Sequence, residues 1–313
     1  MLQTFSHALA HQSGQTSGDI PVYFERFSPV GITSKPPVVM IHGGAHSGAC
    51  YQRTVRGRPG WAYDFVAGGY PVVVPDWPGI GRSGHVPFDR LTGEVVVEGL
   101  DRLIKSLDEP VVLMVHSMAG CYGWRLAELN PGLVRGVIGV TPSPPGNIQP
   151  ETPVVARTET SVEIETFGRR MTIDLTRLNF PAAETVATKY VGDSRFFPRE
   201  LLGEYRASLL GLPPRILMQR RNIEGSQLRV ADPTKLAGQP VLVITGTADL
   251  DHPREVDEAI VTWLNMHGAK AEFCYLGDLG VVGNGHMLMI EDNSSAIARL
   301  MLDWLDAQPL DRE

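Results

Sequence analysis

The sequence lacks several features that define other classes of protein. It has 313 residues but only three cysteines, Cys50, Cys121 and Cys274, which follow no regular spacing. An odd number of unpatterned cysteines argues against a disulfide framework and favours a reducing compartment. No window approaches the roughly 18 apolar residues of a membrane-spanning helix. Residues 1–17 contain neither a basic segment nor an apolar stretch, so we expect no signal peptide and a cytoplasmic protein.

The sequence also lacks a block of basic residues. Its formal net charge is −7 at pH 7, and its lysines and arginines are scattered along the chain. We therefore expect no nucleic-acid partner. Hydrophobic residues are plentiful, at 43% of the chain, which is enough for a large core without disulfides or structural metals.

Short apolar runs alternate with amphipathic segments over most of the chain. The runs that predict strands are 22–27, 37–41, 70–74, 110–114, 134–140, 240–245 and 270–275. The segments that predict the main helices are 60–69, 92–107, 118–129, 254–267 and 293–304. This alternation predicts an α/β fold, in which a mostly parallel sheet is covered by helices on both faces.

The alternation stops for about a hundred residues in the middle of the chain. This part begins with a proline-rich stretch, then predicts a β-hairpin centred on Gly168 and several short helices. A break of that length is too long for a loop within a compact domain. We therefore expect a core formed by residues 1–141 and 237–313. The cap inserted at 142–236 would cover the strand ends, where such sheets bind ligands.

Ser117 is the candidate nucleophile, because it stands between a predicted strand and a predicted helix. At such a sharp turn a hydroxyl is exposed, and the first N–H groups of the helix point toward it. The alternative is a serine that only caps the helix. Val115 and Ala119 replace the two glycines of the usual G-x-S-x-G pattern. We expect Gly120 and Gly123 to provide the close packing instead.

His286 is the candidate general base. It lies between the last predicted strand and the last predicted helix, after glycines and before methionines, as in a loop that enters an apolar site. A histidine that is merely satisfied in the core is the alternative. We expect His116 to point away across the serine turn and His42 to support the turn after its strand. His42 and His46 lack further ligands of the kind a metal needs, so we expect no metal.

The triad acid is expected after the predicted strand at 240–245, from which a carboxylate can reach the histidine loop. Asp249 is our first choice and Asp251 the second, although either could be an ordinary turn aspartate. The acid must bind the far imidazole nitrogen, where it fixes the tautomer and stabilises the imidazolium.

The oxyanion hole and the substrate pocket are expected around the same strand ends. Backbone N–H groups of Gly44 and Met118 would hold the oxyanion, since glycine at a strand end permits a close approach to substrate. The residues expected to bind substrate beneath the cap are Ala45, Met287, Met218, Phe196 and Phe197. Such a pocket suits a small molecule with a largely apolar acyl or alcohol group.

Four arginines of the predicted cap could anchor a substrate carboxylate. They are Arg170, Arg215, Arg220 and Arg221. Because arginine is seldom fully buried unless it is paired, we expect them to be solvated surface residues.

Taken together, these motifs resemble the α/β-hydrolase superfamily over nearly the whole chain. The shared marks are His42-Gly43-Gly44, Asp76-x-x-Gly79-x-Gly81-Arg82-Ser83, the serine turn, Gly246-x-x-Asp249 and His286. The order serine, aspartate, histidine is also that of the superfamily. The resemblance implies an α/β-hydrolase fold, with an eight-stranded, mostly parallel sheet, helices on both faces and an inserted cap.

More narrowly, the chain is similar to a branch of bacterial serine esterases. The shared segments are Gly43-Gly44-Ala45-His46-Ser47-Gly48, Gly57-Arg58-Pro59-Gly60-Trp61 and the G-N-x-H-M-L-M loop around His286. In that branch the acid is often a glutamate after the strand that follows the nucleophile helix, where this chain has Thr141. Asp249 occupies the more usual position of the superfamily.

The residues and the resemblance predict a serine hydrolase that needs no cofactor. It would cleave a carboxylic ester of a small, largely apolar molecule through an acyl-enzyme intermediate. A lactonase is the nearest alternative, and amides and activated C–C bonds are open to the same triad. A ligand-binding protein without catalysis is the remote alternative. The expected partners are the small ester or lactone and, in a homodimer, a second copy of the chain.

Overall fold

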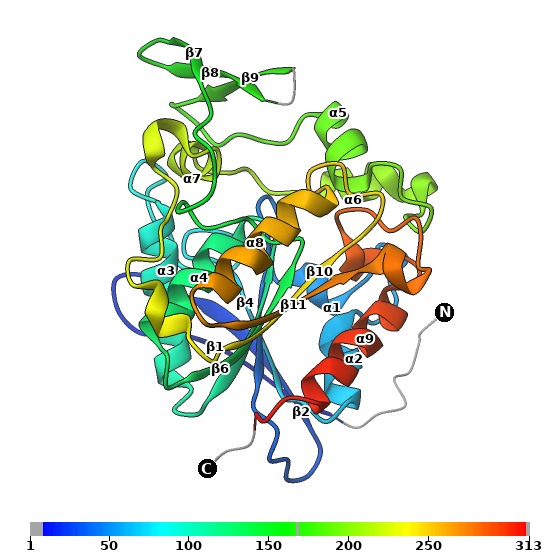
Figure 1. The fold of residues 1–313 in the computed structure, drawn as a ribbon. Coiled ribbons are helices and arrows are strands. Elements are labelled where there is room, and N and C mark those ends of the chain that lie inside the picture. Colours follow the sequence, from blue (N-terminus) through cyan, green and yellow to red (C-terminus); the bar gives the residue numbers. More distant parts are fainter. Residues whose placement is uncertain (1–8, 167–168, 311–313) are drawn as a thin grey trace.

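The computed structural model describes residues 9–166 and 169–310, and one large sheet runs through its middle (Figure 1). The order of its eight strands is β1-β2-β4-β3-β5-β6-β10-β11. They are β1 (Leu9–Gln15), β2 (Tyr23–Pro29), β3 (Val38–Ile41), β4 (Val72–Pro75), β5 (Val111–His116), β6 (Val134–Val140), β10 (Pro240–Thr245) and β11 (Lys270–Tyr275). The six strands from β4 to β11 in this order are parallel, while β2 pairs antiparallel with both β1 and β4. The predicted eight-stranded, mostly parallel sheet is confirmed.

Helices cover both faces of the sheet, as expected. On one side lie α3 (Gly93–Ser106), α4 (Ala119–Leu129) and α8 (Arg254–Met266), and on the other α2 (Trp61–Ala67) and α9 (Ser294–Asp306) (Figure 1). Helix α3 buries Val96, Leu100 and Leu103 along one face and is capped by the Thr92 hydroxyl. Among the described residues, no helix is long and apolar enough to cross a membrane.

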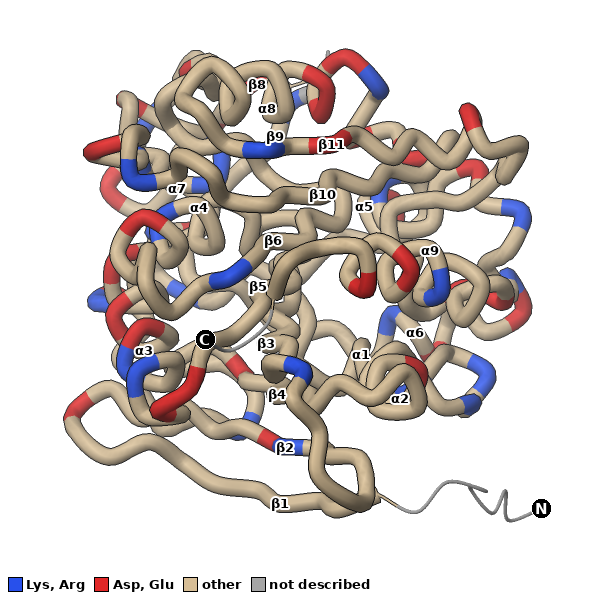
Figure 2. Tube along the Cα trace, turned by 60° about the horizontal axis from the view of Figure 1, so that its bottom comes forward, with Lys and Arg blue, Asp and Glu red and all other residues tan. Residues whose placement is uncertain are grey.

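The strands at the centre of the sheet carry the core. Strands β3, β4 and β5 are buried throughout and contain no charged residue. Parallel strands covered on both faces bury both sides, so they need continuous apolar runs rather than alternation. Figure 2 shows Lys, Arg, Asp and Glu interspersed around the periphery, with few along the central strands. The continuous apolar runs in the sequence therefore correspond to strands that are buried on both faces.

Most of segment 142–236 lies over the carboxyl ends of the strands, and its last residues, 233–236, pack beside helix α4 (Figure 1). A small antiparallel sheet has the order β7-β8-β9, and the predicted hairpin is its β8–β9 pair, whose turn at 167–168 lies outside the described residues. The elements of this segment are β7 (Val154–Arg157), β8 (Ser161–Thr166), β9 (Arg169–Asp174), α5 (Ala183–Thr185), η1 (Val186–Val191), η2 (Arg199–Leu201), α6 (Leu202–Ala207), α7 (Pro214–Arg220), η3 (Ile223–Gly225) and η4 (Pro233–Leu236). We propose that it is a cap on a core formed by 1–141 and 237–313.

Three short helical elements complete the described part of the fold, and a fourth, η1, differs from what the sequence predicts. Helix α1 (Ala49–Gln52) follows β3, while η5 (Leu276–Leu279) and η6 (Leu288–Ile290) flank the histidine loop. Within the proposed cap, η1 is a turn of π-helix where the pattern predicts an ordinary helix. Such turns are rare and are often found at functional sites.

Two glycines explain how the serine turn tolerates a valine. A Cβ added to Gly123 would lie 2.6 Å from Cγ1 of Val115, and one added to Gly120 would lie 2.4 Å from the backbone nitrogen of Ser143. Helix α4 therefore approaches β5 and the Ser143 backbone more closely than a side chain would allow. The expectation that Gly120 and Gly123 supply the close packing is confirmed.

Gly123→Ala is expected to lower the free energy of unfolding by about 1–3 kcal/mol, because the new methyl group overlaps Val115 in a fully packed region. Adding Val115→Ala removes both Cγ atoms, so the two substitutions together should cost less than the sum of the single changes. Urea denaturation of the four proteins in this double-mutant cycle measures the coupling.

Gly132→Ala is the matched control, since its added Cβ would have no described atom within 4 Å apart from those of Gly132 and its two chain neighbours. Its effect should stay below about 0.5 kcal/mol. Strictly additive losses for Gly123→Ala and Val115→Ala would contradict this account of the turn.

Candidate active site

The ends of three adjacent parallel strands define the candidate site. Each of β3, β5 and β6 is followed by a non-glycine residue with a left-handed backbone: Ala45 at φ 62°, Ser117 at φ 51° and Thr141 at φ 41°. This conformation costs on the order of 1–3 kcal/mol per residue and gathers at functional sites. The strain therefore marks this edge of the sheet.

Ser117, His286 and Asp249 come together at this edge. The Oγ of Ser117 lies 2.9 Å from Nε2 of His286, and Nδ1 of His286 lies 2.7 Å from Oδ2 of Asp249. All three side chains are buried. With Nδ1–H donated to the carboxylate, Nε2 is left to accept the serine hydroxyl. This geometry suits removal of the serine proton by the imidazole.

Asp249 is held in its ionised form. Burial alone would raise its pKa, but the charge of His286 and the hydrogen bond from it outweigh burial, so the pKa of Asp249 is lowered from its usual value. An ionised carboxylate at this point can stabilise an imidazolium when one forms.

The second choice for the acid, Asp251, was wrong. Its Oδ2 lies 2.5 Å from Nζ of Lys189 and 3.6 Å from Nη2 of Arg220, whereas the carboxylate that binds Nδ1 of His286 is that of Asp249. The backbone N–H groups of Asp251 and His252 both donate to Oδ1 of Asp249, at 3.0 and 3.2 Å. This tight turn aims Asp249 at the imidazole and sends Asp251 elsewhere.

Thr141 stands where the resemblance noted in the sequence would place a glutamate as the acid. Its Oγ1 lies 3.4 Å from Nδ1 of His286, the same nitrogen that Asp249 binds. A hydroxyl carries no charge, so Asp249 is the group here that can stabilise an imidazolium electrostatically.

The prediction that His116 points away from the site was wrong. Its Nε2 donates to the carbonyl oxygen of His286 at 3.0 Å, and the two ring centroids are 4.9 Å apart. Burial, followed by the charge of His286, lowers the pKa of His116 well below its ordinary value. A neutral His116 therefore fixes the backbone that carries the candidate base.

His42 and His46 support the turn after β3. His42 donates from Nδ1 to the carbonyl oxygen of the next residue at 2.8 Å and accepts from the N–H of Trp77 at 3.2 Å. His46 donates to the carbonyl oxygen of Gly44 at 2.7 Å and accepts from the Tyr205 hydroxyl at 2.8 Å. Burial lowers the pKa of His42 to about 4 and that of His46 to about 3. Both are neutral supports.

The sequence did not predict that His252 lies against the ring of His286. Its ring stacks on that of His286, with centroids 5.3 Å apart, and its Nδ1 lies 2.9 Å from Oδ1 of Asp257. Burial alone would lower its pKa, but the charge and hydrogen bond of Asp257 and the charge of Asp249 raise it overall. The available signal was a histidine that directly follows Asp251 and comes three residues after Asp249.

Glu291 was also missed, and it ties the histidine loop to the proposed cap. Its carboxylate accepts from the Gly285 N–H at 2.8 Å and from Nδ2 of Asn284 at 2.6 Å. The hydroxyl of Ser194, in segment 142–236, donates to the same carboxylate. Burial raises the pKa of Glu291. No local pattern in the sequence predicts the contact between Glu291 and Ser194.

The two residues predicted to form the oxyanion hole lie side by side. A Cβ added to Gly44 would lie 2.0 Å from Sδ of Met118, so a larger residue at 44 would require the Met118 side chain to move. The side chain of Met118 therefore lies directly against the backbone of Gly44. Their role in holding an oxyanion stays a prediction.

The five residues predicted to bind substrate are Ala45, Met287, Met218, Phe196 and Phe197. They lie in the turn after β3, in the histidine loop and in segment 142–236. The carbonyl oxygen of Ala45 accepts from the N–H of Leu210, and Phe197 packs edge-on against Tyr205 with centroids 5.3 Å apart. Met287 and Phe197 are buried, while Met218 and Phe196 are half-buried. Their contact with substrate stays a prediction.

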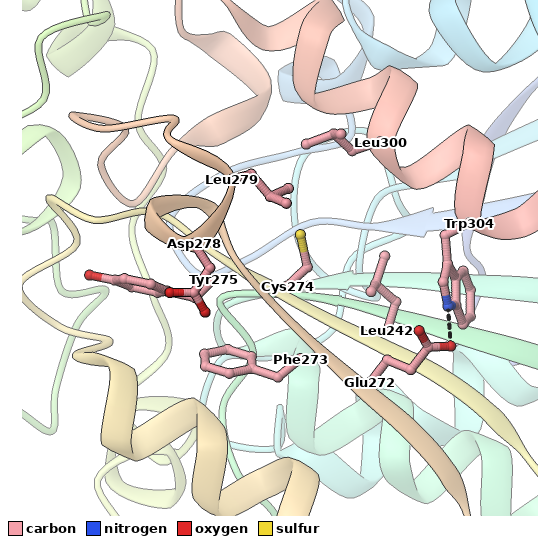
Figure 3. Close-up of a pocket in the computed structure, with 9 residues that line it drawn as sticks. All are labelled: Leu242, Glu272, Phe273, Cys274, Tyr275, Asp278, Leu279, Leu300 and Trp304. Carbon is pink, nitrogen blue, oxygen red and sulfur yellow. Dashed lines mark hydrogen bonds between the residues drawn. The ribbon is translucent and has the colours of Figure 1, made fainter.

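A separate hollow lies at the edge of the sheet, between β11, η5 and α9 (Figure 3). It has a volume of about 250 Å³, and its walls include Phe273, Cys274 and Trp304. The Trp304 indole donates to Glu272 at 2.8 Å on one side of it. None of the residues of the candidate site lines this hollow, so it is a different place. Within residues 9–166 and 169–310 no cluster of three or more His, Cys, Asp or Glu side chains is arranged to hold a metal ion.

Comparisons with known proteins agree with this fold. A sequence profile described as "Alpha/beta hydrolase family" matches residues 38–300. The chain is 26% identical to the "Probable secreted lipase phiG" of Fungal sp. (strain ATCC 74256), over 92% of this chain and 86% of the relative. It is similar in structure to a novel bacterial esterase, with a TM-score of 0.60, 19% identity and 98% of each chain covered.

Two further solved structures are similar to the chain. One is a monoacylglycerol lipase of Paleococcus ferrophilus, with a TM-score of 0.59, 18% identity, and 91% of this chain and 98% of that one covered. The other is the epoxide hydrolase VrEH1 of Vigna radiata, with a TM-score of 0.61, 14% identity, and 96% of this chain and 98% of that one covered. At such identities these likenesses show the fold alone, which supports more than one chemistry.

The buried histidines are expected to titrate far apart. By NMR of the imidazole nitrogens, His252 should have its midpoint above 6.5, since Asp257 stabilises its charged form, while His46 should stay neutral down to about pH 3. Asp257→Asn should lower the His252 midpoint and leave that of His46 in place. A His252 midpoint below 6.5 in the wild type would show that burial outweighs its carboxylate neighbours.

Glu291→Gln is expected to lower the free energy of unfolding by about 1–3 kcal/mol, because an amide NH₂ then faces groups that themselves donate. It should also reduce kcat more than it changes KM, since the histidine loop loses its anchor. Asp292→Asn is the matched control: this exposed neighbour forms surface ion pairs and should change stability by less than about 1 kcal/mol. Equal effects of the two substitutions on kcat would contradict the anchoring role.

Proposed function

This chain belongs to the alpha/beta hydrolase family, and from that premise we propose that it is a serine hydrolase that cleaves carboxylic esters of small molecules. The observation that carries the proposal is that His286 lies within hydrogen-bond distance of both Ser117 and Asp249. Relatives named as lipase and esterase support an ester hydrolase in general. A serine at this turn disfavours epoxide hydrolysis, in which a carboxylate forms the ester intermediate.

In the first half of the proposed reaction, the enzyme is acylated. His286 removes the proton of Ser117 through Nε2 while the serine oxygen attacks the ester carbonyl carbon. The N–H groups of Gly44 and Met118 hold the oxyanion of the tetrahedral intermediate. Asp249 stabilises the imidazolium, which then gives its proton to the alcohol as the C–O bond breaks.

In the second half, water releases the acid. With the alcohol gone, Nε2 of His286 is again neutral and removes a proton from a water molecule that attacks the acyl carbon. The bond to Ser117 breaks, and the serine oxygen takes the proton back. The same imidazole therefore acts as base and as acid in both halves.

Two other expectations stay predictions. The sequence predicts a cytoplasmic protein, whereas the fungal relative carries the word secreted in its name. The homodimer considered from the sequence also awaits a measurement of mass in solution.

Ser117→Ala is expected to abolish ester turnover and also labelling by a fluorophosphonate, because the attacking oxygen is gone. Asp249→Asn should reduce kcat roughly 10³- to 10⁴-fold by removing the charge that fixes the tautomer. Intact-mass spectrometry and turnover of a short-chain 4-nitrophenyl ester measure the two effects.

Ser143→Ala is the matched control: its buried hydroxyl has no hydrogen-bond partner in the described part of the chain, and its backbone N–H donates to the carbonyl oxygen of Ser117 at 2.8 Å. It should keep full labelling. Labelling that persists in Ser117→Ala would overturn the assignment of the nucleophile. A screen of linear esters against lactones of equal size then separates an esterase from a lactonase.

A further inference from the structure

A group of cations lies inside the proposed cap, where the sequence predicts solvated arginines. Arg170 is exposed as expected, with 68% of its side chain accessible, and Arg215 is exposed too. The prediction was wrong for Arg220, whose side chain is only 11% exposed, and Lys189 is only 20% exposed. Arg221 is half-buried beside them. We call Lys189, Arg220 and Arg221 the cation cluster.

The cation cluster contains more positive charge than its protein partners neutralise. In the part of the chain that the structure describes, Asp251 is the one carboxylate within 4 Å of Lys189 or Arg220, and Arg221 has none. Nε of Arg220 is buried and has no hydrogen-bond partner among the residues that the structure describes. Uncompensated buried charge is costly, so three cations around one carboxylate would be stabilised by a second anion.

The positive charges also act on one another. Burial lowers the pKa of Lys189 to about 8; the charge of Asp251 opposes this, and those of Arg221 and Arg220 reinforce it. Burial also lowers the pKa of Arg221, again reinforced by Arg220. Both shifts are what a site short of negative charge produces.

The cluster adjoins the candidate site rather than the outer surface. Tyr190, which follows Lys189, stacks on the ring of His286 with centroids 6.3 Å apart. The charge of Arg220 acts on the thiol of Cys121, one helical turn beyond Ser117. Asp251, the carboxylate among these cations, lies 3.9 Å from Nε2 of His252, whose ring stacks on that of His286 with centroids 5.3 Å apart. The cation cluster is therefore connected to the candidate base through its immediate neighbours.

We propose that the cation cluster is a subsite for a substrate anion, and that the substrate is a carboxylic ester that carries a free carboxylate away from the bond that is cleaved. This inference rests on the proposed esterase function and narrows its substrate class. The free carboxylate binds Arg220 and Arg221 by charge-assisted hydrogen bonds, while Asp251 keeps Lys189 as its partner.

An ion pair that only fastens the cap to the core is the competing explanation. Lys189 and Asp251 would suffice for that purpose, because they already join segment 142–236 to the loop after β10. They leave Arg220 with a single carboxylate contact at 3.6 Å, and Arg221 with a hydrogen bond to the Thr166 hydroxyl at 3.5 Å but no carboxylate among the described residues. The cluster as a whole is therefore better explained by a ligand than by fastening alone.

The test compares matched substrates. The mono-4-nitrophenyl esters of succinic, glutaric and adipic acid each carry a free carboxylate. In the neutral counterparts the 4-nitrophenyl ester is kept and the free carboxylate is converted to a methyl ester. For the best chain length, kcat/KM of the charged ester should exceed that of the neutral one by about tenfold or more, as expected for a hydrogen bond to a charged group. An equal or greater kcat/KM for the neutral ester at every chain length would overturn the proposal.

Three variants locate the effect. Arg220→Gln should reduce the charged-to-neutral ratio of kcat/KM about tenfold or more, mainly through KM. Asp251→Asn should raise the ratio, because it removes the anion that competes for the same cations. Arg215→Gln, on the same helix but exposed, is the matched control and should leave the ratio unchanged. If Arg220→Gln lowers the melting temperature without changing the ratio, the cluster only fastens the cap and the proposal fails.

A binding measurement keeps this inference separate from the proposed function. Calorimetric titration with sodium glutarate should give binding to the wild type that Arg220→Gln weakens about tenfold or more. If no ester is hydrolysed but glutarate binds in this way, the esterase proposal fails and the anion subsite stands. If neutral esters are hydrolysed and glutarate does not bind, the esterase proposal stands and the anion subsite is wrong.

Discussion

The hydrogen bonds on the two nitrogens of His286 are the interactions on which the proposed chemistry depends. They join a serine and a histidine that are 169 residues apart in the sequence, and an aspartate from a third strand end. Contacts from neighbouring residues hold the imidazole ring of His286 and its loop in place. His116 holds its carbonyl oxygen, Glu291 holds the loop just before it, and Gly246 lets that loop approach β10, since a Cβ there would lie 2.4 Å from the carbonyl oxygen of Asn284.

The central strands and the serine turn could be predicted from the sequence, and for a clear reason. Buried parallel strands need continuous apolar runs, and a nucleophile turn needs small residues at fixed spacing, so both leave a local record. Strand β1 leaves none, because it is an exposed edge strand of mixed composition held only by pairing with β2. Asp249 could be separated from Asp251 only by the backbone turn that aims the first at the imidazole.

The support of the site could not be predicted, because it is made by contacts between distant segments. Glu291 binds Ser194 across 97 residues, and Lys189 reaches Asp251 from the proposed cap. Burial of Arg220 likewise follows from how segment 142–236 folds over the sheet, which no local pattern encodes. Tertiary packing also reversed the expected direction of His116. Charge near the site is thus divided: His46 and His116 are neutral, whereas Lys189, Arg220 and Arg221 of the proposed cap surround one carboxylate.

The left-handed backbone of Ala45, Ser117 and Thr141, after β3, β5 and β6, also limits how this protein can evolve. Glycine at position 45, 117 or 141 would relax the backbone and make the fold harder to melt. Glycine at 117 would remove the hydroxyl, and glycine at 45 or 141 would make the backbone near Ser117 more flexible. Lineages adapting to hotter habitats would therefore meet opposing pressures at these three positions, and heat resistance would have to accumulate elsewhere in the molecule.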